Sequence, residues 1–295
     1  MRPAIARLAE VREESLRGEG PGLLLLQAPT GYGKTSATPK LYKGCRREGA
    51  PRLVHALPLR AVVAQAYEKF LMELQGEAVV GYQAHGLGLG GKSPFMSPDL
   101  VVTTMDSYML SLGRVSVGER GFGHYEVPRS SLLTAVTVFD EAHLPYQSGD
   151  PAMATAMYMA VAALTNFGNT CIIETATLGR EALEVLTSTS SHGCVVVEPT
   201  PRGERGAGIP TACRYEPVED PDFFEGASSL EWSFEQGPAE LGEVTEFVAE
   251  VVGQGLRVFV AVDRVVDAIE LYRSCLLYTS PSPRDLSTSR MPSSA

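Results

Sequence analysis

The stretch APTGYGKT at residues 28–35 follows the apolar run GLLLLQ at residues 22–27. A continuous apolar run of this length is typical of a strand that is buried on both faces of a parallel sheet. Two glycines directly after such a strand allow a tight turn that brings backbone N–H groups close to an anion. The sequence therefore predicts a phosphate-binding loop (P-loop) between a strand and the N-terminus of a helix.

Each residue type in this loop suits one part of ATP. The amides of Gly31 and Gly33 can approach the phosphates, and the Lys34 ammonium suits the β- and γ-phosphates. The Thr35 hydroxyl can bind Mg²⁺. An ordinary glycine turn is the alternative, and the preceding buried strand argues against it. The predicted ATP-binding residues are Ala28, Pro29, Thr30, Gly31, Tyr32, Gly33, Lys34 and Thr35.

A second apolar and β-branched run, LLTAVTVFDEAH at residues 132–143, ends in two acids. Adjacent carboxylates at the tip of a buried strand are costly unless a metal or hydrogen-bond donors lie nearby. With a P-loop upstream, we expect Asp140 to bind Mg²⁺ together with Thr35, and Glu141 to orient the attacking water. Acids at a strand end carry little information alone, because solvated acids are common there.

The composition is that of a soluble globular protein, with 44% hydrophobic and 20% charged residues in 295. No apolar stretch reaches membrane-spanning length, and the N-terminus lacks an apolar signal core, so no membrane partner is expected. The five cysteines are scattered without a C-x-x-C pair. That pattern argues against a disulfide framework or a zinc site and fits the reducing cytoplasm. A net charge of −10 disfavours nucleic-acid binding without excluding it.

Apolar strand-like runs alternate with helical patterns along most of the chain. Strands are expected at residues 53–57, 99–104 and 170–178, and a helix is expected to begin at Asp150 and Pro151. This alternation predicts an α/β fold with a doubly wound, mostly parallel sheet and functional sites at the carboxyl ends of its strands. Pro39 falls inside the helix after the P-loop, where we expect a kink or a short 3₁₀ segment.

The predicted domain organisation has five parts. The last part is rich in Ser, Pro and Arg, and it resembles adaptor read-through at the end of an environmental gene fragment. A native disordered tail is the alternative, and an artefact would mean that the chain is truncated. The parts are a helical segment at 1–20, an α/β ATP-binding domain at 21–200, a linker or domain edge at 201–237, the start of a second α/β domain at 238–275, with a strand at 256–263, and a disordered tail at 276–295.

Several stretches resemble motifs of superfamily-2 helicases. Ala28 replaces the first glycine of the usual P-loop, as it often does in helicases. DEAH at residues 140–143 resembles motif II, which implies that His143 reads the γ-phosphate state. TATL at residues 175–178 resembles motif III, which implies that Thr175 and Thr177 couple the nucleotide state to strand binding. Lys34, Asp140, Glu141 and His143 are then the expected catalytic residues.

Two other stretches resemble the motifs of these helicases that touch the nucleic-acid backbone. ALPLRAVVAQAYEKF at residues 56–70 resembles motif Ia, with Arg60 as the cation. VVTTMDSYML at residues 101–110 resembles motif Ib, whose threonine hydroxyls and helix N-terminus can hold a phosphate. The residues expected to contact or couple to nucleic acid are Arg60, Thr103, Thr104, Thr175 and Thr177.

Within that superfamily, residues 20–275 most resemble the CRISPR-associated helicase of type I interference systems. The resemblance implies an incomplete pair of RecA-like domains that pulls single-stranded DNA with ATP and Mg²⁺. It also implies two partners, a CRISPR surveillance complex and an HD nuclease. No His-Asp dipeptide occurs in the sequence, so we expect the nuclease to be a separate protein or to have been cut off. Motif VI with its arginine finger is also missing, and its loss costs on the order of 10³- to 10⁵-fold in turnover.

Three alternative functions stay open at this level. The first is a generic DEAD/DEAH-type helicase that acts on RNA or in DNA repair. The second is a P-loop ATPase that moves no nucleic acid, although the LSGGQ signature of transporters is absent. The third is an inactive nucleotide-binding fragment.

Overall fold

The structure is a computed structural model that describes residues 1–114, 126–147, 151–190, 192–202, 209–228, 241–255, 258–262 and 264–276. The chain divides into two compact units, Met1–Ser229 and Leu230–Ala295. The first unit holds an eight-stranded sheet in the order β3-β4-β2-β5-β6-β1-β7-β8, and all its strand pairs are parallel. The predicted α/β fold with a parallel sheet is thus confirmed. The strands are β1 (Leu23–Gln27), β2 (Leu53–Leu57), β3 (Val80–Gln83), β4 (Leu100–Thr104), β5 (Val136–Phe139), β6 (Cys171–Thr175), β7 (Cys194–Thr200) and β8 (Arg214–Glu219).

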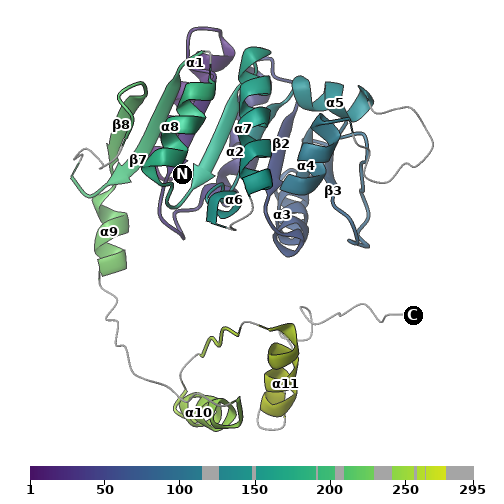
Figure 1. The fold of residues 1–295 in the computed structure, drawn as a ribbon, viewed down its shortest axis with the longest axis vertical. Helices are drawn as coiled ribbons and strands as arrows, with labels where there is room; N and C mark the ends of the chain where they lie inside the picture. The colour runs from purple at the N-terminus through teal and green to yellow at the C-terminus, as the bar shows by residue number, and fades with distance from the viewer. Residues whose placement is uncertain are drawn as a thin grey trace. The chain divides into compact units, whose positions relative to one another are not determined.

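Helices cover both faces of this sheet (Figure 1). On β1, Leu24 and Leu26 pack into the core cluster of helices α1 to α3, whereas Leu23 and Leu25 pack into the cluster of α4, α5, α7 and α8. Both faces of the strand are therefore buried, which explains its continuous apolar run. The helices are α1 (Pro3–Leu16), α2 (Lys34–Arg47), α3 (Arg60–Glu73), α4 (Met105–Leu112), α5 (Glu126–Leu133), α6 (Leu144–Gln147), α7 (Pro151–Asn166) and α8 (Arg180–Thr189).

The parallel register brings the predicted motifs to one edge of the sheet. Gln27 at the end of β1 aligns with Thr175 at the end of β6, and Phe139 at the end of β5 aligns with Ile173 on β6. Strand β6 therefore lies between the strand before the P-loop and the strand before Asp140. The loops that follow these three strands meet at the same carboxyl edge.

Helix α2 runs without interruption from Lys34 to Arg47, with Pro39 inside it. The expected 3₁₀ segment is therefore absent from this helix. Pro39 removes one backbone hydrogen bond, but Ala37 and Leu41 on either side of it are anchored in the core cluster. Side-chain packing thus holds the helix at the point where the backbone is weakest.

Residues 201–237 are expected to form a linker or a domain edge, and the linker alternative does not hold for residues 214–228, because β8 and helix α9 (Pro221–Ser228) lie there. Strand β8 is at the edge of the sheet, is partly exposed and contains Pro217, which an edge strand tolerates. Glu216 on this strand pairs with Arg7 of α1 at 2.6 Å. The polar composition that suggested a linker therefore reflects an edge strand.

A disulfide joins Cys194 and Cys213, with a Cα–Cα distance of 4.9 Å. The expectation that the cysteines form no disulfide is therefore wrong for this pair. The two residues are 19 positions apart, but β7 begins at Cys194 and β8 begins just after Cys213. The pairing of β7 with β8, which the sequence did not reveal, brings them together. Cys45 and Cys171 are free and buried.

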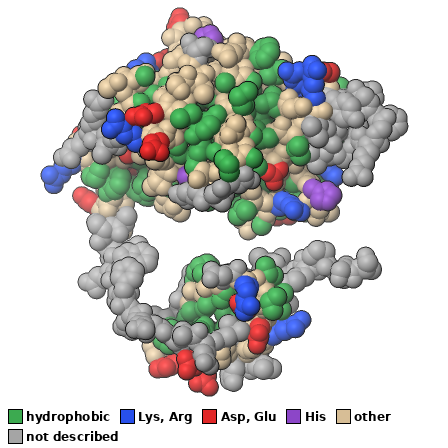
Figure 2. All heavy atoms as spheres, in the orientation of Figure 1, with side chains coloured by type: hydrophobic (Ala, Val, Ile, Leu, Met, Phe, Trp, Pro, Cys, Tyr) green, Lys and Arg blue, Asp and Glu red, His purple; other side chains and the backbone are tan. Residues whose placement is uncertain are grey.

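Helix α7 lies over the sheet, as expected of an apolar helix. Met157, Val161 and Leu164 are buried, whereas Met159 is 67% exposed and Phe167 just beyond the helix is 64% exposed. Apolar side chains accordingly gather on the face that α7 and its neighbours form (Figure 2). Among the described residues, no helix combines the length and the apolar content that a membrane crossing requires.

The structure also bears on the expected ends of one strand and one helix. The predicted strand at 132–143 is shorter, because Leu132 and Leu133 complete α5 and the strand begins at Val136. The proposed helix cap Asp150 lies outside the described residues, although the helix does begin at Pro151.

The second unit contains helices α10 (Leu241–Gly253) and α11 (Val265–Leu276). Residues 258–262 form no strand, so the strand expected at 256–263 is wrong over that stretch. A lone strand leaves its backbone groups unpaired, and Phe259 is 92% exposed. The tail expected at 276–295 lies outside the described residues apart from Leu276.

Replacement of Phe139 should test how far stability depends on the core at the site. Its ring is fully buried and packs edge-on against Tyr108 at 5.0 Å. Phe139→Ala should lower the free energy of unfolding by about 3–5 kcal/mol in urea titrations. The control Val185→Ala, at a position 42% exposed on α8, should stay within about 0.5 kcal/mol of the native chain. Equal effects of the two changes would contradict the assigned core.

Candidate functional site

The P-loop turns on two glycines in the left-handed region. Gly31 has φ of 81° and Gly33 has φ of 93°, and a Cβ at either position would meet nothing within 4 Å. The glycines are therefore needed for backbone conformation and leave open space beside the loop. Helix α2 begins at Lys34, so its N-terminal dipole and free N–H groups face this loop.

Lys34 is folded back onto the P-loop and is 5% exposed. Its Nζ donates to the carbonyl of Ala28 at 2.8 Å and to that of Pro29 at 3.3 Å. Both partners are neutral, and among the described residues no carboxylate forms an ion pair with Lys34. A phosphate bound in the loop would supply the negative charge that this ammonium lacks.

Thr35 and Asp140 meet across the edge of the sheet. The Thr35 hydroxyl donates to Asp140 Oδ2 at 2.5 Å, and the backbone N–H of Glu141 donates to Asp140 Oδ1 at 2.9 Å. Burial raises the pKa of Asp140, but its contacts with His55, Thr35 and the Glu141 amide outweigh burial and hold the pKa below its ordinary value. Asp140 is therefore a carboxylate with a hydroxyl beside it, and both are oxygen ligands of the kind that Mg²⁺ prefers.

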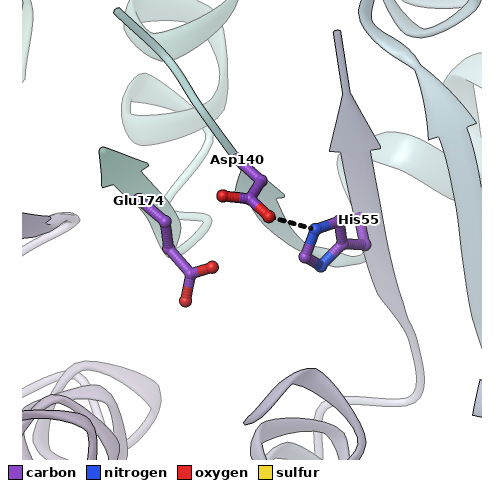
Figure 3. A group of neighbouring side chains, drawn as sticks. All are labelled: His55, Asp140 and Glu174. Atoms are coloured by element: carbon purple, nitrogen blue, oxygen red, sulfur yellow. Dashed lines mark hydrogen bonds and ion pairs between the residues drawn. The ribbon is translucent and has the colours of Figure 1, made fainter. Parts of the chain in front are cut away.

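Two further buried groups stand beside Asp140 (Figure 3). His55 on β2 has its Nε2 at 3.4 Å from Asp140 Oδ2 and its Nδ1 at 2.8 Å from the Thr38 hydroxyl. Glu174 comes from β6, the strand between β5 and β1. One ligand atom each from His55, Asp140 and Glu174 lies within 4.8 Å of the other two, and all three residues are fully buried.

Neither carboxylate oxygen of Glu174 has a hydrogen-bond partner within the described structure. Burial raises the pKa of Glu174 well above its ordinary value, and the charges of Asp140 and Glu141 raise it further, against the opposing effect of Lys34. A buried carboxylate without partners costs free energy and is a common mark of a functional position.

His143 connects the acidic element to the strand that carries TATL. Its Nδ1 lies 3.4 Å from Glu141 Oε2 and 3.3 Å from the Thr175 hydroxyl, which also donates to the carbonyl of Thr177 at 3.3 Å. Glu141 has φ of 50°, an uncommon backbone conformation for this residue type. A change at Glu141 can therefore reach Thr175 through one imidazole ring.

The site geometry agrees with the comparison to known protein families. The DEAD/DEAH box helicase profile matches residues 12–185. The chain belongs to the DEAD/DEAH box helicase family. It is 35% identical over 154 residues to the CRISPR-associated helicase Cas3 of Thermoproteus tenax, an alignment that covers 47% of this chain and 26% of that protein.

A solved Cas3 structure shares the fold of this chain. The crystal structure of T. fusca Cas3-ATP matches with a TM-score of 0.50 and 21% identity, over 64% of this chain and 22% of that one. A CRISPR RNA-guided surveillance complex in a pre-nicking state matches with a TM-score of 0.44 and 21% identity, over 64% of this chain and 20% of that one. The chain thus spans about a quarter of the relatives it matches.

Not every predicted helicase residue presents its side chain to this site. Tyr32, although within the P-loop, is 1% exposed, and its hydroxyl donates to Asp220 at 2.8 Å. Its backbone N–H bonds to the carbonyl of Pro29. Tyr32 therefore fixes the loop to the fold, whereas the exposed Thr30 and Gly31 remain at its surface.

The residues expected to contact nucleic acid lie at the same edge of the sheet but differ in exposure. Arg60 at the start of α3 and Thr177 are exposed. Thr103 donates its hydroxyl to the carbonyl of Gln83 at 2.7 Å, and Thr104 caps α4. The two buried threonines thus serve the fold, and their roles toward nucleic acid stay predictions.

Sequence reasoning missed His55, Thr38 and Glu174. Two of them carried a usable signal, because His55 and Glu174 each place a titratable group in an otherwise apolar strand, LVHAL and CIIET. A titratable residue inside a buried strand next to a helicase motif is a candidate for that motif's site.

The raised pKa of Glu174 predicts a pH-dependent stability in EDTA. The unfolded chain releases this proton above about pH 4.3, whereas the folded protein retains it to a higher pH. Stability is therefore lost as the pH rises above that value, by about 1.4 kcal/mol per pH unit until the folded pKa is reached. Glu174→Gln should accordingly gain stability relative to the native chain as the pH rises above about 4.3, measured by urea unfolding.

A matched control is Glu184→Gln on α8, where the side chain is 49% exposed. The difference in the free energy of unfolding between Glu184→Gln and the native chain should change little over the same pH range. A difference between Glu174→Gln and the native chain that is constant with pH would contradict the raised pKa.

Proposed function

We propose that this chain is an ATP–Mg²⁺-binding helicase domain that translocates on single-stranded DNA in type I CRISPR interference. The contact between Thr35 and Asp140 carries the proposal, because it joins the P-loop to the DEAH element 105 residues away. The helicase family supports ATP hydrolysis as the class of activity.

The residues present fit ATP and Mg²⁺. The Gly31 and Gly33 turns and the N-terminus of α2 bind the phosphates, and Lys34 turns from the loop carbonyls to the β- and γ-phosphates. Thr35 and Asp140 hold the magnesium ion, which neutralises charge on the phosphate oxygens when it is bound. Glu141 is 32% exposed beside them, where it can orient a water molecule.

Coupling of the nucleotide to the nucleic acid runs through His143 in this proposal. Its imidazole contacts both Glu141 and Thr175, so a shift of the acidic loop moves the end of β6. Thr177 lies two residues further on and is exposed, as a residue that contacts a strand must be.

Single-stranded DNA would cross the carboxyl edge of the sheet beside Arg60. The net charge of −10 means that the protein has to bind phosphates through a few local cations and backbone amides. The exposed start of α3 and the N-terminus of α4 are suited to this.

The similarity to the Thermoproteus tenax protein favours a CRISPR role over a generic helicase that acts on RNA or in repair. The partners proposed on this basis are a CRISPR surveillance complex and a separate HD nuclease. Binding of the chain to such a complex on DNA, but not to free duplex RNA, would distinguish the two functions.

Replacement of Lys34 should test the nucleotide site. Lys34→Ala should weaken binding of a fluorescent ATP analogue in Mg²⁺ by about 10- to 100-fold, because it removes a charged phosphate contact. Lys40→Ala removes the same charge from an exposed position on the same helix and should leave binding unchanged. Equal affinities of the native chain and Lys34→Ala would overturn the assignment of the P-loop.

Replacement of Arg60 should test the nucleic-acid path. Arg60→Ala should weaken binding of single-stranded DNA and lower the slope of log affinity against log salt by about 0.7. Arg47→Ala, at the exposed far end of α2, removes the same charge from the opposite edge of the sheet. If the two variants lose affinity equally, DNA does not follow the proposed edge.

A further inference from the structure

The three groups His55, Asp140 and Glu174, here called the buried triad, lie close together inside the fold (Figure 3). We propose that the buried triad binds a divalent transition-metal ion, such as Mn²⁺, without any nucleotide. The proposal rests on the proposed function for the part that Asp140 plays toward Mg²⁺. The proposal adds His55 and Glu174 to Asp140 as metal ligands.

The spacing of the triad suits one ion. Ligand atoms about 2.0–2.2 Å from a metal lie up to about 4.4 Å apart when they stand opposite each other. The ligand atoms of the triad lie within 4.8 Å of one another, so a side-chain shift of a few tenths of an ångström brings them into range. Three neighbouring strands, β2, β5 and β6, fix the backbones that carry them.

The charge balance of the triad also favours a cation. Once Glu174 gives up its proton to the metal, Asp140 and Glu174 offer two negative charges, which match one divalent cation. A dication would give the two Glu174 oxygens the partner that they lack among the described residues.

His55 is oriented as a metal ligand by a second group. Its Nδ1 lies 2.8 Å from the hydroxyl of Thr38 on α2. With a metal bound, Nδ1–H would donate to that hydroxyl and Nε2 would give its lone pair to the metal, in place of its present contact with Asp140. Thr38 is itself fully buried, so this arrangement is shielded from water.

The donor set selects the class of metal. Mg²⁺ prefers six oxygen ligands and retains several waters, which a fully buried triad with an imidazole does not offer. One imidazole and two carboxylates suit Mn²⁺, Co²⁺ and other transition ions better. The triad should therefore prefer Mn²⁺ to Mg²⁺ when no phosphate is present.

The test is a titration of the full chain with Mn²⁺ in the absence of nucleotide. The electron paramagnetic resonance signal of free Mn²⁺ reports how much of the metal stays unbound. One saturable site per chain is expected, and a tenfold excess of Mg²⁺ should leave most of it occupied. Glu174→Gln should lower the affinity of this site for Mn²⁺ on the order of 10-fold or more. The echo-modulation spectrum of bound Mn²⁺ should show a ¹⁴N coupling that His55→Gln abolishes.

Glu216→Gln is the control, because it makes the same change at a largely buried carboxylate on β8 outside the triad. It should leave Mn²⁺ affinity unchanged, and circular dichroism should show that all variants are folded. Equal Mn²⁺ affinity in the native chain and Glu174→Gln would overturn the proposal, and so would bound Mn²⁺ without a nitrogen coupling. Either result would show that Mn²⁺ binds to acids at the surface instead. Binding of an ATP analogue is measured separately, so loss of the metal site and loss of the nucleotide site are distinguishable.

Discussion

The hydrogen bond from Thr35 to Asp140 is the constraint on which the site depends. It requires β1 and β5 to end at the same edge of the sheet, with one strand between them. Both strands are buried on both faces, so their direction and register follow from packing. The α2 N-terminus, the DEAH acids and the end of β6 are brought together as a consequence of that packing.

Strand β6, which lies between β1 and β5, contributes two side chains to the site. Strand β6 carries Glu174 beneath the Thr35–Asp140 contact and Thr175 toward His143. Side chains alternate across a strand, so neighbouring residues of β6 serve two different groups. Consecutive residues of β6 thus contribute to the buried triad and to the contact with His143.

Much of this could be predicted from sequence because it depends on local pattern. The P-loop, the acids after β5 and the two-sided sheet follow from apolar runs that end in glycines or carboxylates. Edge strand β8 escaped, because Pro217 and exposed charges resemble a linker when its pairing to β7 is unknown. The Cys194–Cys213 disulfide and the approach of His55 to Glu174 depend on the same kind of long-range pairing, which spacing along the chain does not encode.

A double-mutant cycle on Thr35 and Asp140 tests the central claim most directly. The measurement is the Mg²⁺-dependent affinity for a fluorescent ATP analogue in the native chain, Thr35→Ala, Asp140→Asn and the double variant. If the two residues hold one ion, the double variant should bind about as weakly as the weaker single variant, with a coupling of about 0.5–3 kcal/mol. Losses that add in full would show two independent residues and would contradict the account.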